Sequence, residues 1–274
     1  TLSIILCVMM LLSACSFAIP ASAAPEGTAI NTADEFLAMV STPADATEPT
    51  AKYYLAADIT LPASYAEPFW GILDGNGYGV YGIYIQDGKT GYSSTPAYAT
   101  GLIPRTKEGG NVTVKNLEVD YMFTRYDSIS GPIIGSVHSA NATIDNCFVG
   151  QNVYSDSSYV GNLVGYVYGS DITLNVNNCY SLSTGHANTG HYAFIGYTHW
   201  TYVPNINLVN CYNANGRIIS ENRKPFTATN CYEGADGGLN TGVTTLTNMK
   251  GADALEVSMS GIKRFYKSIE TVNI

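Results

Sequence analysis

The chain has 274 residues, of which only 13% are charged; 13 Lys and Arg against 22 Asp and Glu give a formal net charge of −9. No stripe of basic side chains is present to neutralise phosphates, so nucleic acid is not an expected partner. The 21 tyrosines and the abundance of glycine, asparagine, serine and threonine favour a β-rich exterior of uncharged polar side chains over a helical protein.

Residues 1–24 are typical of a secretory signal peptide. The apolar run from Leu2 to Ala14 is too short to span a bilayer and is followed by Ala21-Ser22-Ala23, which fits an A-x-A cleavage site. Leu12-Ser13-Ala14-Cys15 also resembles a bacterial lipobox, in which Cys15 would carry a lipid; alternatively, Cys15 simply lies in the apolar run. The chain opens without Met, so we interpret it as lacking a few residues. The expected location is extracellular or at the cell surface, with no transmembrane segment in the mature chain.

The domain predicted over residues 25–245 begins with a short helix. Thr32 and Glu35 have the spacing of a capping box, and Phe36, Leu37 and Val40 follow on one helical face. Such a helix would cover the open end of a stack of strands, which otherwise exposes edges and core. Strand-like runs follow over 53–61, 69–73 and 80–87, with the tight-turn signal Asp74-Gly75-Asn76-Gly77 before the last of them.

A repeat of about thirty residues, centred on 101–232, dominates the remainder of this domain. One position of the repeat follows an aliphatic residue and recurs at intervals of 31, 30 and 31 residues, as Pro104, Gly135, Gly165 and Gly196. A second position follows an asparagine and recurs at intervals of 30, 32 and 32 residues, as Leu117, Cys147, Cys179 and Cys211. A fixed period of this size indicates supersecondary units that bury their apolar faces by stacking on one another.

The asparagines and cysteines of the repeat are expected to form two structural ladders. Asparagine tolerates the left-handed conformation at a bend, and identical amides one coil apart can bond to each other. These asparagines are Asn116, Asn146, Asn178, Asn210 and Asn230. The cysteines Cys147, Cys179, Cys211 and Cys231 are predicted to stack as free, buried thiols about 4.8 Å apart. Disulfides, with three pairings for four residues, are the alternative for an exported chain. A metal site is not expected, because no CxxC or Cys/His spacing occurs.

The hydrophobic pattern changes after residue 245. Apolar residues recur at three- and four-residue steps, which predicts a helical segment over 246–274, interrupted by Gly251 and Gly261. This segment would be a C-terminal cap or a linker to a module that the chain lacks.

The glycine-bearing arms resemble the GLUG-type repeats of bacterial extracellular and surface proteins. The resemblance rests on Asn162-Leu163-Val164-Gly165-Tyr166 and Phe194-Ile195-Gly196-Tyr197, each followed by an Asn-Cys-Tyr triplet. It implies an all-β, right-handed parallel β-helix, secreted or surface-displayed and often part of a modular protein. The family has no shared catalytic residues or cofactor to carry over. The first repeat departs from the pattern, since Pro104 replaces the glycine and Leu117 the cysteine.

The favoured function is a non-catalytic scaffold for adhesion or for contact with carbohydrate or a host-surface protein, acting as a monomer or within a larger protein. Tyr166, Tyr197 and Trp200 are the candidate ligand-contact aromatics, because aromatic rings can pack on sugars. Tyrosines recur at corresponding places of the repeat and could form an exposed strip, although we expect most of them in the core; they are Tyr166, Tyr180, Tyr197, Tyr212 and Tyr232.

The alternative function is a polysaccharide-active enzyme, a glycoside hydrolase or a lyase. A hydrolase needs two carboxylates facing one bond, but the candidates contain no Asp-Asp pair; they are Asp120, Asp127, Asp145, Asp156 and Asp171. A lyase needs a basic residue, and residues 126–216 contain neither Lys nor Arg. The histidines His186, His191 and His199 could bind a metal or act as acid and base, or could be solvated loop residues. No catalytic residue, cofactor or metal ligand is therefore assigned.

Overall fold

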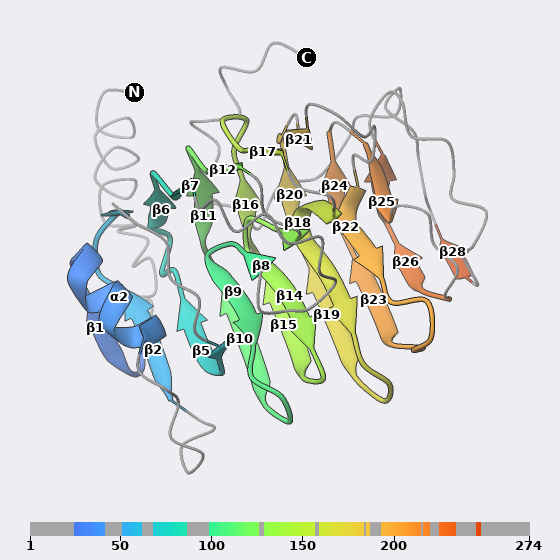
Figure 1. Cartoon of the computed structure of the whole chain (residues 1–274), viewed down its shortest axis with the longest axis horizontal. Helices are drawn as coiled ribbons and strands as arrows, with labels where there is room; N and C mark the ends of the chain where they lie inside the picture. Colours follow the sequence, from blue (N-terminus) through green and yellow to red (C-terminus); the bar gives the residue numbers. More distant parts are fainter. Residues whose placement is uncertain are drawn as a thin grey trace, which may run out of the picture.

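The structure is a computed structural model that describes residues 25–41, 51–61, 68–86, 99–125, 129–156, 159–183, 185–186, 193–214, 216–219, 225–233 and 245–247. The predicted signal peptide, Cys15, His191 and Asp127 lie outside these residues. Within them, the chain winds through repeated coils whose strands pair in parallel with the equivalent strands of the next coil (Figure 1). The expected all-β parallel β-helix is confirmed.

Each regular coil passes through sheets A, B, D and C in that order. Sheet A has nine strands: β1 (Thr28–Ile30), β2 (Lys52–Leu55), β5 (Gly71–Asp74), β10 (Asn111–Lys115), β15 (Asn141–Asp145), β19 (Thr173–Asn177), β23 (Asn205–Val209), β26 (Thr227–Thr229) and β28 (Thr245–Thr247). Sheet B has seven: β3 (Ile59–Thr60), β6 (Gly79–Tyr81), β11 (Glu118–Asp120), β16 (Phe148–Val149), β20 (Tyr180–Ser181), β24 (Tyr212–Asn213) and β27 (Tyr232–Glu233).

The return path of each coil runs through the two other sheets. Sheet D has four strands: β7 (Tyr84–Gln86), β12 (Phe123–Arg125), β17 (Tyr154–Asp156) and β21 (Gly185–His186). Sheet C has eight: β4 (Pro68–Phe69), β8 (Ala99–Thr100), β9 (Ile103–Thr106), β13 (Ile129–Ser130), β14 (Ile134–His138), β18 (Tyr159–Tyr168), β22 (Ala193–Thr198) and β25 (Arg217–Ile219).

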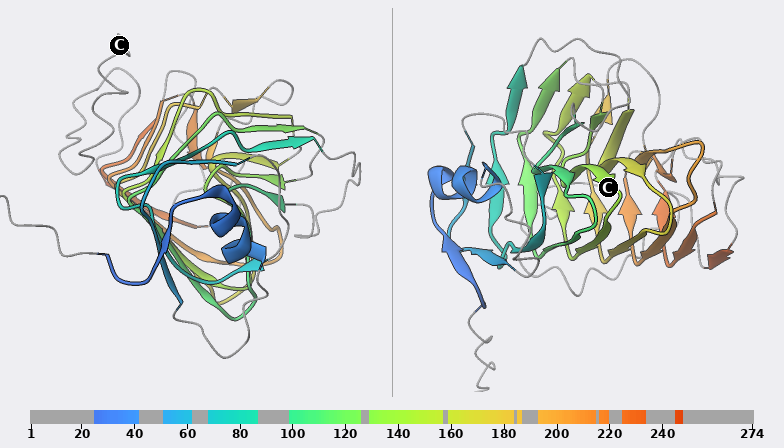
Figure 2. Two further views of the ribbon diagram at one scale, coloured as in Figure 1. Left: turned by 90° about the vertical axis from the view of Figure 1, so that its left-hand side faces the viewer. Right: turned by 60° about the horizontal axis from the view of Figure 1, so that its bottom comes forward.

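The helix α2 (Ala33–Ser41) lies across the N-terminal end of the coil, as the end-on view in Figure 2 shows. Its first turn is a capping box: the Glu35 N–H donates to Thr32 Oγ1 over 3.2 Å, and Thr32 N donates to the Glu35 carboxylate over 3.1 Å. Backbone hydrogen bonds, first from Asn31, hold the pKa of Glu35 below its usual value. Phe36 and Val40 on the inner face are buried. The helix therefore covers the core at the end of the stack, as expected.

The register of the strands reproduces the period of the sequence. In sheet C, Ile134 pairs with Ile103 on one side and with Val164 on the other, and Val164 pairs with Ile195. These four residues are the aliphatic positions that precede Pro104 and the three repeat glycines, and all are fully buried.

The repeat glycines are explained by a close approach between backbones. A Cβ on Gly135 would lie 2.6 Å from the carbonyl oxygen of Thr100, and one on Gly165 would lie 2.6 Å from that of Ser130. In each case the obstructing strand, β8 or β13, belongs to the preceding coil.

The C-terminal boundary differs from the prediction at its first residues. Leu246 and Thr247, expected to begin a helical segment, lie in β28, where Leu246 pairs with Ala228 and Thr247 with Thr229. The Thr-Leu-Thr sequence alternates like the Thr-Ala-Thr of β26, so pairing in register is favoured over helix here. Residues 248–274 lie outside the described part. Across the described ranges, no helix has the length and apolarity to cross a bilayer.

Candidate functional site

The turn between sheets A and B is built by the repeat asparagines. All five adopt positive φ, between 51° and 54°: Asn116, Asn146, Asn178, Asn210 and Asn230. Asparagine tolerates this left-handed conformation better than other residues with a Cβ, because its short amide can bond locally. One asparagine per coil therefore sets the bend from sheet A into sheet B.

The asparagine amides form a ladder along the coil axis, with one irregularity. Nδ2 of Asn146, Asn210 and Asn230 each donates to Oδ1 of the asparagine one coil before it, over 2.9–3.1 Å. Asn178 instead donates to the carboxylate of Asp145 over 2.9 Å. Asn146 Oδ1 is consequently buried without a partner. The ladder is thus interrupted where an acidic acceptor competes with the amide.

The cysteines that follow these asparagines are free and buried in the core: Cys147, Cys179, Cys211 and Cys231. The thiol of Cys179 donates to Asn177 O over 3.0 Å, and that of Cys211 to Val209 O over 3.3 Å. Burial raises the pKa of the Cys179 and Cys211 thiols well above the usual value. The thiolate is the reactive form of cysteine, so a raised pKa makes the thiols of Cys179 and Cys211 unreactive. Leu117 fills the same position in the first repeat and is also buried.

A single exposed tyrosine strip is not what the structure contains. Tyr180 and Tyr212 lie in sheet B, where Tyr180 stacks between Phe148 and Tyr212 at centroid distances of 5.6 and 4.8 Å. Both tyrosines are buried, as is Tyr166 in sheet C, so these three lie in the core, where most of the five repeat tyrosines were expected. Burial raises the pKa of Tyr180 and of Tyr212. Tyr232 of β27 pairs with Tyr212 of β24. The structure does not describe the side chain of Tyr232.

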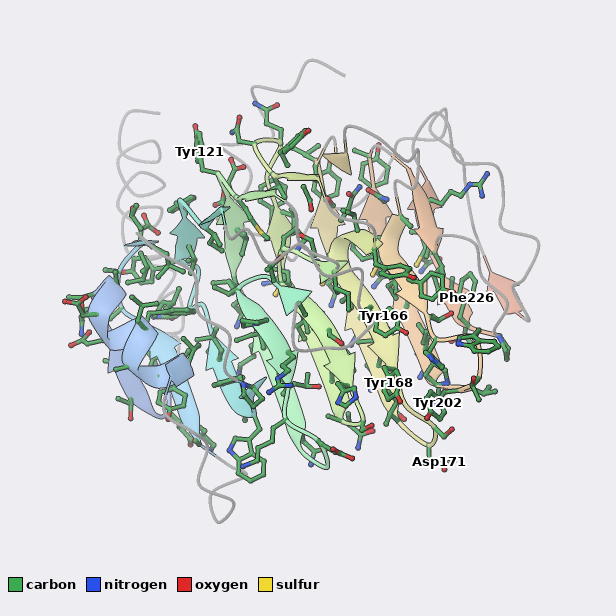
Figure 3. All side chains as sticks on the ribbon, viewed as in Figure 1. Tyr121, Tyr166, Tyr168, Asp171, Tyr202 and Phe226 are labelled. Atoms are coloured by element: carbon green, nitrogen blue, oxygen red, sulfur yellow. The ribbon has the colours of Figure 1, made fainter. Side chains whose placement is uncertain are left out.

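The surface of sheet C carries a different group of rings, which we call the aromatic cluster. It consists of eight rings linked by contacts of 4.6–6.3 Å between centroids: His138, Tyr159, Tyr166, Tyr168, Tyr197, His199, Trp200 and Tyr202. They come from β14, β18 and β22 and from the turn that follows β22. Figure 3 shows Tyr166, Tyr168 and Tyr202 near one another, with Tyr121 at the opposite edge.

Tyr166 is the buried centre of the aromatic cluster. Its ring is parallel to that of Tyr197 within 2° at 5.6 Å, and it packs with Ala99 and Ile129 of β8 and β13. Only 1% of Tyr166 is exposed. The prediction that its ring contacts a ligand is therefore wrong. Burial raises its pKa above the usual value. The repeat glycines allow β8 to lie close to β14 and β13 close to β18, and Ala99 of β8 and Ile129 of β13 cover this ring.

The accessible side of the aromatic cluster lies toward Trp200. Trp200 is 68% exposed, whereas Tyr159, Tyr168, Tyr197, His199 and Tyr202 are half-buried. The hydroxyls of Tyr168 and Tyr202 are hydrogen-bonded over 3.2 Å, and this bond raises the pKa of Tyr168. Trp200 thus projects from a turn that hydrogen-bonded and stacked rings hold in place.

Sequence reasoning identified Tyr197 and Trp200 in this cluster but missed His138, Tyr159, Tyr168 and Tyr202. One signal was available, because Tyr166 and Tyr168 are two residues apart and so share a face of a strand. The contact of His199 with Tyr168, at 4.9 Å between centroids, depends on the register of adjacent coils. His199 belongs to this stack, while the side chain of His186 lies outside the description.

Two of the candidate carboxylates, Asp120 and Asp145, accept hydrogen bonds from asparagines within the coil. Asp120 accepts from the backbone N–H and from Nδ2 of Asn152, over 2.9 and 3.0 Å. Asp145 accepts from Asn178. Asp171 has φ 57° in an exposed turn. The side chain of Asp156 lies outside the description. In the ranges described, no group of three or more His, Cys, Asp and Glu residues is placed to hold a metal ion.

No family model and no curated protein sequence matches the chain. Among solved structures, the chain is similar to one described as "a putative immunoglobulin A1 protease from Bacteroides ovatus". The two are 17% identical with a TM-score of 0.45, and the match covers 82% of this chain and 84% of the other. A likeness of this degree carries no argument about function, which therefore rests on the surface just described.

Proposed function

We propose that this chain is an exported, non-catalytic β-helix that contacts carbohydrate at a cell or host surface through its aromatic cluster. The exposed indole of Trp200, held beside the half-buried rings of His199 and Tyr202, is the observation that carries the proposal. Aromatic faces pack against the C–H faces of sugar rings, and tyrosine hydroxyls supply hydrogen bonds at the rim. Assignment of the arms to GLUG-type repeats, and of residues 1–24 to an export signal, belongs to the same proposal.

The environment of the carboxylates supports a binding role over catalysis. A glycosidase needs two carboxyl groups that converge on one bond. Asp120 and Asp145 instead accept hydrogen bonds from asparagines in the turns and ladders that shape the coil. A carboxylate so engaged stabilises a turn, and removing it would first affect the fold.

The proposal is tested by measuring the binding of the purified full chain to a glycan array and repeating the measurement with Trp200→Ala. We expect binding to fall at least tenfold, because an exposed aromatic anchor carries much of a small interface. The free energy of unfolding, measured by thermal unfolding, should change by less than about 0.5 kcal/mol, since the side chain is on the surface. Tyr121→Ala is the matched control: Tyr121 is 61% exposed but lies after β11, away from the cluster. A wild-type chain that binds no glycan would refute the proposal.

A further inference from the structure

The turn after β18 and the turn after β22 lie side by side at the exposed edge of the aromatic cluster. Backbone hydrogen bonds join the two turns at both ends. Where the turns begin, His199 N donates to Val167 O over 3.0 Å. Where they end, Asn205 N donates to Ile172 O over 2.9 Å. The two turns therefore occupy the same corner of successive coils, about 4.8 Å apart where their backbones bond.

These two turns carry Asp171 and Trp200, and both residues are accessible to a ligand. Trp200 is 68% exposed, and Asp171 is exposed with φ 57°. The hydrogen bond between the hydroxyls of Tyr168 and Tyr202 also links the two turns. Figure 3 shows Asp171 on the same side of the molecule as Tyr168 and Tyr202. A carboxylate thus accompanies the exposed rings of the cluster.

The segment that supplies every ring of the cluster has no Lys or Arg side chain, from residue 126 to residue 216. Arg105 of β9 lies three strands, or about 14 Å, from β22. Lys107 follows β9 and packs over the Trp70 ring at 4.2 Å. Arg217 of β25 pairs with the start of β22, at the end of that strand away from the turn. No described basic side chain therefore lies on the turns beside the exposed indole.

The charges that do act on the cluster are negative. The turns after β18 and β22 carry one formal charge, that of the Asp171 carboxylate. Glu108 is exposed in the turn after β9. The pKa of Tyr168 is raised first by its hydrogen bond to Tyr202 and then by burial, and the charge of Glu108 acts in the same direction. A surface of rings with carboxylates at its rim attracts cations and repels anions.

We infer that the ligand of the aromatic cluster is a glycan of amino sugars with free, protonated amines, whose ring packs on Trp200 while its ammonium group binds the Asp171 carboxylate. This inference rests on the proposed function. Among aromatic rings, the indole attracts cations most strongly, and a carboxylate beside it adds a charge-assisted hydrogen bond. A uronate or a sulfate would meet a like charge at Asp171, and a neutral sugar would gain no ion pair there.

The experiment compares each amino-sugar glycan with its own N-acetylated form, because acetylation removes the charge and keeps the sugar and its linkages. A glycan array that carries such pairs, together with uronate-bearing and sulfated glycans, is probed with the full chain at a pH below the pKa of the sugar amine. Calorimetry then measures the affinities for the tightest pair. We expect the free-amine form to bind at least tenfold more tightly, with an affinity that falls as salt is raised.

Asp171→Asn tests the carboxylate itself. Asparagine accepts the left-handed backbone as aspartate does, so the turn should keep its conformation. We expect the affinity for the free-amine form to fall about tenfold and that for the N-acetylated form to stay unchanged. Asp34→Asn is the charge-matched control, because Asp34 lies in the first turn of α2, at the N-terminal end of the coil. This control should leave both affinities unchanged.

Three results would count against this assignment. Equal affinity for the free-amine and N-acetylated forms, or tightest binding of an acidic glycan, would overturn the inference and leave the proposed function standing. An equal loss of affinity for both forms in Asp171→Asn would show that Asp171 supports the turn and does not bind the amine, which would also overturn it. Binding of no glycan at all would overturn both the inference and the proposed function.

Discussion

The asparagine turn between sheets A and B and the aromatic cluster on sheet C belong to the same coils but follow different rules. In the turn, the same residue type recurs in five successive positions with nearly the same φ. In the cluster, the rings are confined to β14, β18, β22 and the turn after β22, whereas Arg105 of β9 pairs with Ser136 of β14 and Lys107 follows β9. The asparagines that recur in every coil stabilise the stacking of coils. The rings that only some coils carry are available for recognition.

The two regions also differ in exposure. The cysteines beside the asparagine turn are buried with free thiols, and the amides bond from coil to coil. The cluster instead grades from the buried Tyr166 to Trp200 at the surface. This contrast can be tested by asking which substitutions affect the fold and which affect only binding.

The largest effect on stability is expected at Gly165, where β18 lies close to the backbone of β13 and β14. In Gly165→Ala, the new methyl group would lie 2.6 Å from Ser130 O and 2.7 Å from Gly135 O, both backbone atoms that cannot rotate away. We expect a loss of about 3 kcal/mol in the free energy of unfolding, measured by chemical denaturation. Gly109→Ala is the control: Gly109 has φ 73° and no atom within 4 Å of its Cβ position, so only about 1 kcal/mol of strain applies. Equal losses of unfolding free energy in the two variants would show that the backbones around Gly165 are not close-packed.

A smaller effect is expected in the asparagine ladder. Asn210→Ala places alanine at φ 54° and removes the hydrogen bonds with Asn178 and Asn230, so we expect a loss of about 2 kcal/mol. Asn210→Gly removes the same bonds but tolerates the backbone, and should lose about 1 kcal/mol less. Thermal unfolding of the two variants separates conformation from hydrogen bonding. If they unfolded alike, the turn would not depend on the left-handed preference.

The smallest effect is a dependence on alkaline pH. Burial raises the pKa of Tyr180 and Tyr212 in the folded chain above the usual value of 10.0. The unfolded chain therefore releases these protons first, so stability is unaffected below about pH 10 and falls as the pH rises further. Denaturation at a series of pH values should show this decline, and Tyr180→Phe should make it shallower. A flat profile above pH 10 would mean that the sheet B tyrosines are accessible to water.

The coil architecture could be predicted because each coil requires the same residue types at the same positions, and these recur in the sequence at a fixed interval. Asn116 and its counterparts recur at the bend since each coil needs one residue that accepts the left-handed conformation. The positions of Ile134 and Val164 recur since each coil contributes one buried aliphatic at the same height. The capping box of Thr32 and Glu35 is likewise a short-range signal.

Other features followed from packing between distant segments. Tyr166 and Tyr197 look alike in sequence, yet β8 and β13 cover Tyr166 and leave Tyr197 half-buried. Asn178 deviates from the ladder because Asp145 of the preceding coil offers a stronger acceptor. The juxtaposition of Arg105 with Ser136 likewise depends on register.

The sequence by itself determined that this chain stacks coils of about thirty residues, because backbone conformation and side-chain burial at each bend must be met within one repeat. Only the tertiary structure decided which rings meet the solvent and which polar atoms lack partners. Those properties depend on which side chains of a neighbouring coil cover each residue. These neighbours lie about thirty positions away in the sequence, so the local hydrophobic pattern does not reveal them.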